Sequence, residues 1–394
     1  MLKISKDIHW TGYIDWDLKV FHGYKTPFGS TYNAYLIDDE CPTLIDTVKY
    51  YGRDDMLRQI KEIMNPADIR YVVANHAEMD HSGAIDDIMR LAPDAEIVCP
   101  ARGAEALTRH FKKNWRFKVV KTGDRLSIGK RELMFIQIPM VHWPESMATY
   151  SVTDHILFPN DAFGQHYASE ERFVDELPLD RILEEAAKYY ANIVLLYGPQ
   201  VQKALHALKD FTIDMICPSH GLIWRDRPQI DHIMNSYDRW SSHETDPTRV
   251  LIVYDTMWKS TETMALRLKA LFEEAGHLVV VRNLQEHHIS DVMTDVLRSR
   301  LMLVGTPMLN NHMLPTVASF LMYLKGLQPQ NRLALIFGSY GWSKAGFKEV
   351  EQFVADAGFT LGAEGQYIQF VPGEDDLQKL NMVVDQLKAQ MPSV

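Results

Sequence analysis

Two imidazoles and two carboxylates lie within six consecutive residues, His76-Ala77-Glu78-Met79-Asp80-His81. They follow an apolar β-type run at residues 71–74, and a strand that ends in a tight turn can direct several side chains into one cavity. A folded chain rarely gathers so many titratable ligands without a cation that neutralises them. The segment therefore predicts a metal centre.

Three further candidate ligands follow predicted strands downstream. They are His142, Asp161 and His220, and a glycine follows the last of them directly. Together with the first segment they make four histidines and three carboxylates. One structural zinc needs only four ligands, so the count favours two metals that share a bridging carboxylate.

The second half offers a different chemistry, in three loops that each follow a predicted strand. A hydroxyl-rich loop at residues 255–261 opens a predicted helix, where backbone N–H groups and hydroxyls can form an anion nest. No G-x-G-x-x-G follows the first strand, and there is no P-loop. The candidate ligand-binding residues are Thr256, Met257, Trp258, Lys259, Ser260 and Thr261, then Thr306, Pro307, Met308, Leu309, Asn310 and Asn311, then Ser339, Tyr340, Gly341 and Trp342.

Hydrophobic patterning divides the chain at a polar stretch, residues 241–248. Before it, short β-prone runs are interspersed with helical patterns. The predicted strands are 30–37, 43–47, 70–74, 95–99, 117–121, 133–138 and 148–152, and the helices are 54–63, 85–91, 103–111, 179–190 and 200–208. After it, strands at 249–254, 279–282, 301–304, 333–337 and 367–370 alternate with helices at 261–275, 291–298, 314–327, 344–357 and 375–391. This regular alternation is typical of a doubly wound sheet, which binds ligands at the carboxyl ends of its strands.

Composition narrows the class of protein. A chain of 394 residues has room for two domains, and a formal net charge of −11 argues against nucleic acid as a partner. Three separated cysteines without a C-x-x-C pair fit a reducing cytoplasm and exclude a rubredoxin-type iron site. No signal core or apolar run long enough for a membrane span occurs, so we expect a cytoplasmic protein that makes no membrane contact.

The motif H-x-E-x-D-H, followed in order by His142, Asp161 and His220, resembles the metallo-β-lactamase superfamily. More specifically, it is similar to the flavodiiron proteins, which include the rubredoxin:oxygen oxidoreductases. Zinc hydrolases of that superfamily usually carry histidine where this chain has Glu78, and a carboxylate there favours iron. The resemblance implies an α/β chain with an N-terminal metallo-β-lactamase-like αββα sandwich at residues 1–248. A C-terminal flavodoxin-like, doubly wound, parallel five-stranded sheet would follow at residues 249–394.

The resemblance also assigns the ligands. His76, Glu78 and His142 would hold one iron, Asp80, His81 and His220 the other, and Asp161 would bridge them. The histidine that corresponds to His81 leaves the metal in some family members. His22, Tyr24 and Tyr189 match positions where the family donates hydrogen bonds or protons to a bound ligand. Trp143 directly follows a ligand and would wall the pocket.

The loops of the second half resemble those that bind FMN in this family. Reduced FMN and a diferrous site each hold two electrons, enough together to reduce O2 to water, while reduction of two NO to N2O needs two. His312 departs from the family, in which glycine is common at this position. The chain ends at Val394 without a fused rubredoxin, so the expected electron donor is a separate rubredoxin or similar small protein. The family further implies a head-to-tail homodimer, or a dimer of dimers, that places one protomer's FMN beside the irons of the other.

Two other classes of function remain open from the residues. A binuclear zinc site could activate water for hydrolysis of an ester or thioester, although Glu78 argues against zinc and the second half would then be idle. Alternatively, the chain could be an electron carrier with a degenerate first half, although all seven ligands are present.

Overall fold

The computed structural model describes residues 2–391. The chain forms two compact units. The first consists of residues up to 189 together with 199–238, and the second of 190–198 together with the residues from 239 onward. None of the helices in the described chain is both long enough and apolar enough to cross a membrane.

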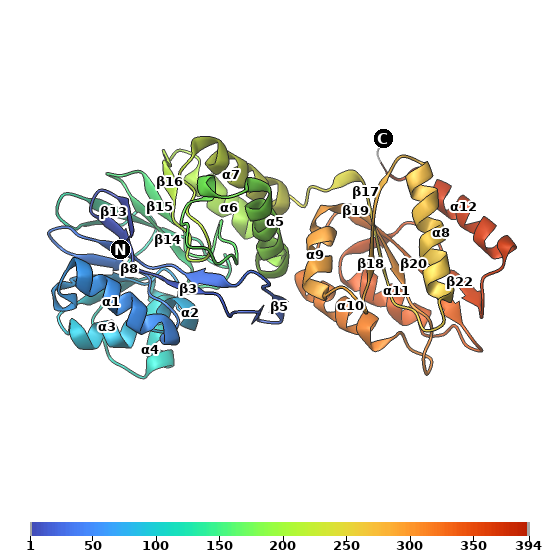
Figure 1. Ribbon diagram of the computed structural model, residues 1–394, viewed down its shortest axis with the longest axis horizontal. Coiled ribbons are helices and arrows are strands. Elements are labelled where there is room, and N and C mark those ends of the chain that lie inside the picture. Colours follow the sequence, from blue (N-terminus) through green and yellow to red (C-terminus); the bar gives the residue numbers. More distant parts are fainter. Residues whose placement is uncertain (1, 392–394) are drawn as a thin grey trace. The chain divides into compact units, whose positions relative to one another are not determined.

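The first unit is built on two β-sheets (Figure 1). One has seven strands in the spatial order β1 (Leu2–Ser5), β2 (Ile8–Trp10), β7 (Tyr35–Ile37), β8 (Thr43–Ile45), β9 (Tyr71–Val73), β10 (Glu96–Cys99) and β11 (Phe117–Val119). The other has five, β12 (Arg125–Ser127), β13 (Glu132–Gln137), β14 (Met147–Ser151), β15 (Ile156–Phe158) and β16 (Met215–Ile216). Helices flank both sheets, namely α1 (Arg53–Ile63), α2 (Met79–Ser82), α3 (Ile85–Leu91), α4 (Ala101–Phe111), α5 (Leu179–Tyr189), α6 (Gly198–Leu208) and α7 (Arg227–Ser241).

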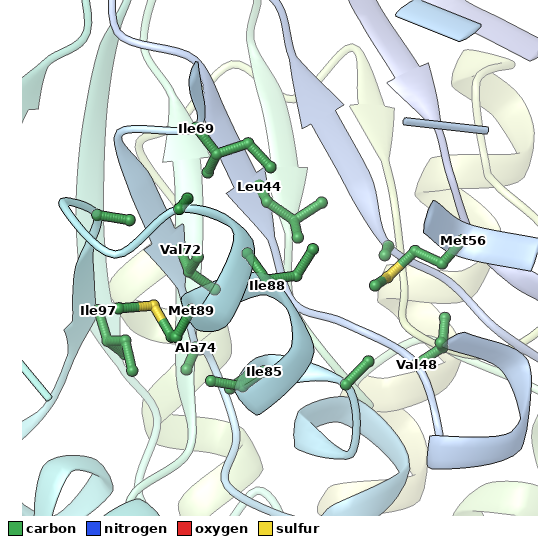
Figure 2. Close-up of a cluster of buried hydrophobic side chains, with 14 of the residues drawn as sticks. Leu44, Val48, Met56, Ile69, Val72, Ala74, Ile85, Ile88, Met89 and Ile97 are labelled. Atoms are coloured by element: carbon green, nitrogen blue, oxygen red, sulfur yellow. The ribbon is translucent and has the colours of Figure 1, made fainter. Parts of the chain in front are cut away.

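The period-two alternation of the central strands explains this layering. Leu36, Leu44 and Val72 point to the helical side, where they pack with residues of α1, α3 and α4 (Figure 2). Their neighbours Ile45 and Val73 point to the opposite face and join the core shared with the second sheet. Each central strand is therefore buried on both faces, as expected for the αββα sandwich.

Two small ribbons extend from the first unit. β3 (Tyr13–Asp15) pairs with β6 (Ser30–Tyr32), and β4 (Val20–Phe21) pairs with β5 (Tyr24–Lys25). His22 and Gly23 form the two-residue turn of the second ribbon, with φ of 51° and 78°. Such a turn matches the right-handed twist of a hairpin and fixes the direction of the His22 side chain.

The second unit is a parallel sheet with helices on both faces. Its strands are β17 (Asp246–Tyr254), β18 (Leu278–Asn283), β19 (Ser299–Gly305), β20 (Arg332–Tyr340), β21 (Phe359–Leu361) and β22 (Gln366–Gln369), in the order β18-β17-β19-β20-β21 with β22 also on β20. The helices are α8 (Ser260–Glu274), α9 (Ile289–Arg298), α10 (Pro315–Leu327), α11 (Phe347–Asp356) and α12 (Glu374–Lys388). Alternate residues of β17, β19 and β20 pack with α8 and α12 in one core.

The α/β class and the doubly wound sheet are confirmed, with one difference in the strand count. Five strands were predicted, whereas β21 and β22 pair with successive parts of β20 and share one edge position. The prediction also missed α7 and the short strands β1 to β5. In addition, β17 begins at Asp246, inside the predicted linker.

A buried ion cluster in the first unit supplies a test of stability. Arg131 is 5% exposed and its guanidinium lies 3.1 Å from Asp39 and 2.9 Å from Asp154. Arg131→Met would leave both carboxylates without this cation, so we expect a loss of about 3–5 kcal/mol in the free energy of unfolding. The measurement is urea denaturation. Arg125→Met, which removes an exposed pair with Glu132, should cost less than about 1 kcal/mol.

The same cluster predicts a pH dependence. Burial favours a higher pKa for Asp39, but hydrogen bonds from the N–H groups of Lys130 and Glu40 and from Arg131 outweigh it and lower that pKa. The stabilisation is therefore complete above the unfolded-state pKa of Asp39 and is lost as pH falls through the folded-state pKa. The stability difference between the wild type and Arg131→Met should narrow on acidification. A difference independent of pH would contradict this explanation.

Candidate metal centre and flavin-binding loops

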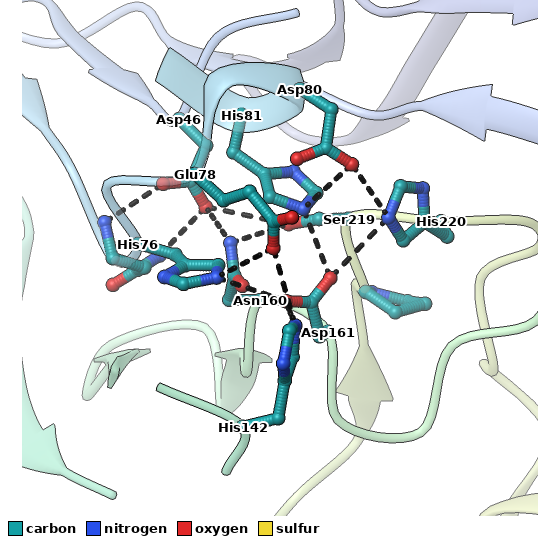
Figure 3. Close-up of polar contacts among 12 residues, drawn as sticks. Asp46, His76, Glu78, Asp80, His81, His142, Asn160, Asp161, Ser219 and His220 are labelled. Carbon is teal, nitrogen blue, oxygen red and sulfur yellow. Dashed lines mark hydrogen bonds and ion pairs between the residues drawn. The ribbon is translucent and has the colours of Figure 1, made fainter. Parts of the chain in front are cut away.

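The seven predicted metal ligands meet at one end of the two sheets (Figure 3). His76 lies in the loop that follows β9, and Asp80 and His81 lie on the short helix α2 at the end of this loop. His142, Asp161 and His220 lie in the loops that follow β13, β15 and β16. Because these strands all end toward the same edge, residues far apart in the sequence converge on one pocket.

The first group of ligands surrounds one point. His76 Nε2 and His142 Nε2 lie 3.2 and 3.3 Å from Glu78 Oε2. The same nitrogens lie 3.7 and 3.4 Å from Asp161 Oδ2. Ligand atoms held about 2.0–2.2 Å from one ion are roughly 3.0–3.5 Å apart, so the spacing suits a shared cation.

The second group has the same form on the other side of Asp161. His220 Nε2 and His81 Nε2 lie 3.2 and 3.4 Å from Asp80 Oδ2. Asp161 Oδ1 lies 3.0 Å from His81 Nε2 and 3.4 Å from His220 Nε2. Each oxygen of Asp161 thus faces one pair of histidines, which is the geometry of a bridging carboxylate between two metals.

Hydrogen bonding within the protein does not satisfy these ligands. Within the described chain, both carboxylate oxygens of Asp80 and Asp161 and both ring nitrogens of His81 are buried and make no hydrogen bond. Such groups are costly to bury unless a cation coordinates them. The donor set, histidine nitrogen with carboxylate oxygen, suits a divalent transition metal, and the additional carboxylate of Glu78 makes it harder than a set with histidine at that position.

The carboxylates make the pocket strongly electronegative. Burial lowers the pKa of His76, yet hydrogen bonds with Glu145 and Glu78 outweigh burial and raise it to about 9. Burial is likewise outweighed at His81, where the charges of Asp80 and Asp161 raise the pKa to about 9. A metal ion must displace these protons, so its binding releases protons to solvent.

Two ligands are oriented through their second ring nitrogen. His76 Nδ1 lies 2.7 Å from Glu145 Oε1, which also accepts the Ala77 N–H at 3.1 Å. His220 Nδ1 lies 2.8 Å from the carbonyl oxygen of Thr31. In each case the acceptor directs Nε2 toward the pocket and raises the basicity of the ligand. Sequence analysis did not identify Glu145, which is three residues from His142.

Asp46 joins three ligand loops through hydrogen bonds (Figure 3). It is 2% exposed and accepts hydrogen bonds from the Asn75 backbone and side chain at 2.8 and 3.0 Å. It also accepts from Asn160 at 3.3 Å and from Ser219 at 3.4 Å. These three donors directly precede His76, Asp161 and His220 in the chain. Sequence analysis missed Asp46 because no local pattern marks a residue that acts through the neighbours of ligands.

Replacement of Glu145 tests the orientation of His76. We expect Glu145→Gln to weaken metal binding by about 10–100-fold, because the amide cannot hold the imidazole as a carboxylate does. Titration with Fe(II) under anaerobic conditions measures this affinity. The matched control is Glu132→Gln on β13, whose carboxylate pairs with the exposed Arg125. Equal affinity in all three proteins would show that Glu145 does not support the ligand.

The structure places the three predicted proton-donor residues at different distances from the ligands. His22 Nε2 lies 3.1 Å from Glu78 Oε1, and the His22 side chain is 56% exposed. Tyr189 is buried, with its ring centroid 6.0 Å from that of His220. Tyr24 is buried against the ring of His166, 5.3 Å between centroids. Trp143 meets the ring of His76 edge-on at 5.0 Å and walls the pocket.

His166 also lies beside the pocket, and sequence analysis did not select it. It is fully buried, its ring centroid is 4.8 Å from that of His220 and 5.1 Å from that of Tyr189, and its Nδ1 lies 2.7 Å from Ser30 Oγ. Burial and the neighbouring His220 hold its pKa well below the ordinary value, so it is a neutral imidazole. Its position five residues after Asp161 was the only signal in the sequence.

The first loop of the second unit fits an anion. Thr256 and Thr261 have buried hydroxyl oxygens that make no hydrogen bond within the described chain. They flank the N-terminus of α8, where free backbone N–H groups and the helix dipole favour a phosphate. Lys259 immediately precedes the helix with a φ of 67°. This loop is therefore suited to hold the phosphate of a nucleotide-type ligand.

The other two loops are joined to each other and shaped by turns. The Met308 N–H donates to the Ser339 carbonyl at 2.9 Å. Asn310 and Asn311, with φ of 51° and 64°, form a two-residue turn. A side chain at Gly338 would lie 1.9 Å from the Thr306 carbonyl oxygen, so only glycine permits this approach.

His312 lies outside the turn and pairs with a helix. Its Nδ1 is 2.9 Å from Glu349 Oε2 on α11, and its side chain is 70% exposed.

The three loops also expose several large apolar side chains to solvent. These are Met257, Trp258, Leu309 and Trp342, with Phe370 and Val371 after β22.

A sandwich of two sheets with a pocket of candidate metal ligands, joined in one chain to a doubly wound sheet with a hydroxyl-rich loop at a helix N-terminus, defines a metallo-β-lactamase-like domain fused to a flavodoxin. Comparison with known protein families supports both domain assignments. Residues 31–221 match the ODP family beta lactamase, and residues 252–381 match flavodoxin.

Three relatives extend the likeness over the whole chain. The nitric oxide reductase of Moorella thermoacetica is 41% identical over 95% of each chain. The solved structure of rubredoxin oxygen:oxidoreductase from Desulfovibrio gigas superposes with a TM-score of 0.96 at 37% identity, over 99% of this chain and 98% of that one. The crystal structure of the flavodiiron protein from Giardia intestinalis superposes with a TM-score of 0.94 at 34% identity, again over 99% of this chain and 98% of that one. The chain belongs to the flavodiiron protein family.

Proposed function

We propose that this protein reduces O2 to water, NO to N2O, or both, at a non-haem diiron centre. Electrons would reach the centre from FMN in the second unit. The observation that carries the proposal is Asp161, whose two oxygens face two separate histidine pairs. Together with Glu78 in place of a histidine, it gives a ligand set suited to two irons. The proposed ligands are His76, Glu78, His142, Asp80, His81, His220 and the bridging Asp161.

Bound iron would supply the reduction of the gas, and FMN would supply electrons one at a time. The chain's own residues would manage protons. His22 bonds Glu78 and is partly exposed, so it can exchange protons between solvent and the rim of the pocket. Burial raises the pKa of Tyr189 well above its usual value, so its phenol stays protonated and can donate a hydrogen bond. The neutral His166 beside it would keep added positive charge away from His220.

FMN would bind at the carboxyl edge of the second unit. Thr256 and Thr261 with the start of α8 would hold its phosphate, and residues 306–311 and 339–342 would enclose the ring. The exposed apolar side chains on these loops support a further expectation, a head-to-tail homodimer in which a second copy covers the flavin edge. The donor would be a rubredoxin-type protein, as in the rubredoxin oxygen:oxidoreductase relative.

The test is anaerobic stopped-flow of the reduced, iron-loaded protein mixed separately with O2 and with NO. Flavin absorbance and gas consumption are followed together. Reoxidation of the flavin much faster than that of free FMN, without release of peroxide, supports O2 reduction, and the same behaviour with NO supports NO reduction. Failure of both gases to accelerate reoxidation, in protein shown to contain two irons, would refute the proposal.

A further inference from the structure

A row of aromatic rings leads from a metal ligand to the surface of the first unit. The ring centroid of Tyr32 is 5.7 Å from that of His220 and 6.1 Å from that of Tyr51. Tyr51 in turn lies 5.3 Å from Tyr50. Tyr32 is fully buried, whereas Tyr51 and Tyr50 are 40% and 61% exposed. The row therefore begins at the pocket and ends in solvent.

The two inner phenols share a buried carboxylate. Tyr51 donates a short hydrogen bond to Asp15, and the hydroxyls of Tyr32 and Tyr51 lie 3.2 Å apart. Asp15 is 5% exposed, and its other oxygen accepts the Leu18 N–H at 3.1 Å. The phenol of Tyr51 thus has a proton acceptor already in place, within a network whose members polarise one another.

The charges around the two rings decide how they can react. Burial and the hydrogen bond to Asp15 raise the pKa of the Tyr51 phenol far above the ordinary value, so it remains protonated in the resting protein. The Lys49 ammonium lies 5.7 Å from the ring centroid of Tyr32 and 5.1 Å from that of Tyr51. A ring that lost an electron while keeping its proton would be a cation beside this ammonium. Oxidation is therefore favourable only when the proton leaves at the same time.

We propose that Tyr32, Tyr51 and Asp15 form a redox-active relay that carries an oxidising equivalent from the metal pocket to the surface. The proposal rests on the proposed function, because gas reduction would supply the oxidant. An O2-derived oxidant in the pocket takes one electron from Tyr51 through the rings of Tyr32 and His220. The phenolic proton of Tyr51 passes to the Asp15 carboxylate, which leaves a neutral tyrosyl radical and a carboxylic acid.

An external thiolate completes the cycle at the exposed end. It gives one electron to the Tyr51 radical, directly or through Tyr50, and becomes a thiyl radical. The Asp15 carboxylic acid returns its proton to the Tyr51 oxygen, so the phenol and the carboxylate are both restored. Such a relay would protect the metal ligands from oxidation whenever O2 reaches the pocket while the flavin has no electrons to give.

The experiment is freeze-quench electron paramagnetic resonance of the iron-loaded protein with ferrous irons, oxidised flavin and no donor, after mixing with hydrogen peroxide. Ring-deuterated tyrosine identifies the signal by its altered hyperfine structure. We expect a tyrosyl radical in the wild type, its loss in Tyr51→Phe, and its loss in Tyr32→Phe because the ring path to the oxidant no longer includes the hydrogen-bonded phenol. Asp15→Asn should also remove it, and Asp15→Glu should restore it. Tyr71→Phe, on β9 outside the row, is the matched control and should keep the signal.

Metal content and unfolding temperature are compared among all variants. A radical of wild-type intensity in Tyr51→Phe or Asp15→Asn would overturn the relay, as would the absence of any tyrosyl radical in fully loaded wild-type protein. If Tyr32→Phe fails to fold, the test rests on Tyr51→Phe, at a partly exposed position, and on the comparison of Asp15→Asn with Asp15→Glu. Gas consumption is a separate measurement: a protein that consumed neither gas yet formed the Tyr51 radical with peroxide would refute the proposed function and support the relay.

Discussion

Asp161→Asn is expected to remove gas reduction almost completely. An amide presents one oxygen and one N–H group, so it cannot offer an anionic oxygen to each histidine pair as Asp161 does at 3.0–3.7 Å. The carbonyl could serve one side while the N–H group faced the imidazoles of the other. We expect the iron content to fall from two to one or fewer, and turnover to fall by more than the roughly 100-fold loss that is typical of residues that only support a ligand.

Iron analysis and gas-consumption rates measure the two effects on one preparation. The matched control is Asp210→Asn, which makes the same chemical change at an exposed position in the same unit and should leave iron content and turnover unchanged. Two tightly bound irons in Asp161→Asn would refute the bridging assignment, since the remaining ligands would then hold both ions without a shared carboxylate.

Glu78→His should change which metal the pocket prefers. Glu78 Oε2 lies 3.2–3.3 Å from two ligand histidines, so an imidazole at this position would give one metal three nitrogen donors and a single carboxylate. That set is the softer one typical of zinc hydrolases. Zinc has no redox chemistry, so we expect the variant purified from cells to contain mainly zinc and to reduce neither O2 nor NO above background.

Glu78→Asp is the control, because it shortens the side chain but keeps the carboxylate. It should retain iron as the preferred metal even where its activity falls. The measurement is competition between Fe(II) and Zn(II) for the metal-free protein, read by elemental analysis after separation from free ions. An unchanged preference in Glu78→His would show that the carboxylate does not select iron, and the argument from Glu78 against a zinc hydrolase would fail.

The second unit was well predicted because its signals are long and regular. The buried strands around residues 249–254, 301–304 and 333–337 are continuous apolar runs, and helices of 10 to 15 residues lie between them along the chain. The missed elements gave weak signals. Strands β1 to β5 contain two to four residues each, too few for a period to be recognised. In α7 the buried apolar residues Ile230, Ile233 and Tyr237 form only a narrow stripe on a polar helix.

The clustering of the seven candidate ligands was predictable because four of them lie in one short segment and the other three each follow a strand. The residues that support them were not. Glu145 and Asp46 act through hydrogen bonds to ligands or to the neighbours of ligands, and a partner of this kind can come from any loop that the fold brings near. The ring of His166 likewise reaches His220 only through tertiary folding. Such positions can be recognised only from the three-dimensional structure, which shows which loops lie next to one another.

The hydrogen bonds of Asp46 have a consequence for how the protein matures. They tie together the residues before His76, Asp161 and His220 with bonds that involve no metal. Three of the ligand loops are thus fixed when the chain folds, in contrast to zinc fingers, where metal binding and folding are one event. Metal binding would then follow folding as a separate, late step. The ion that fills the pocket is then governed by the supply of metals that the folded protein meets, and a wrongly filled molecule can be emptied and refilled without being unfolded.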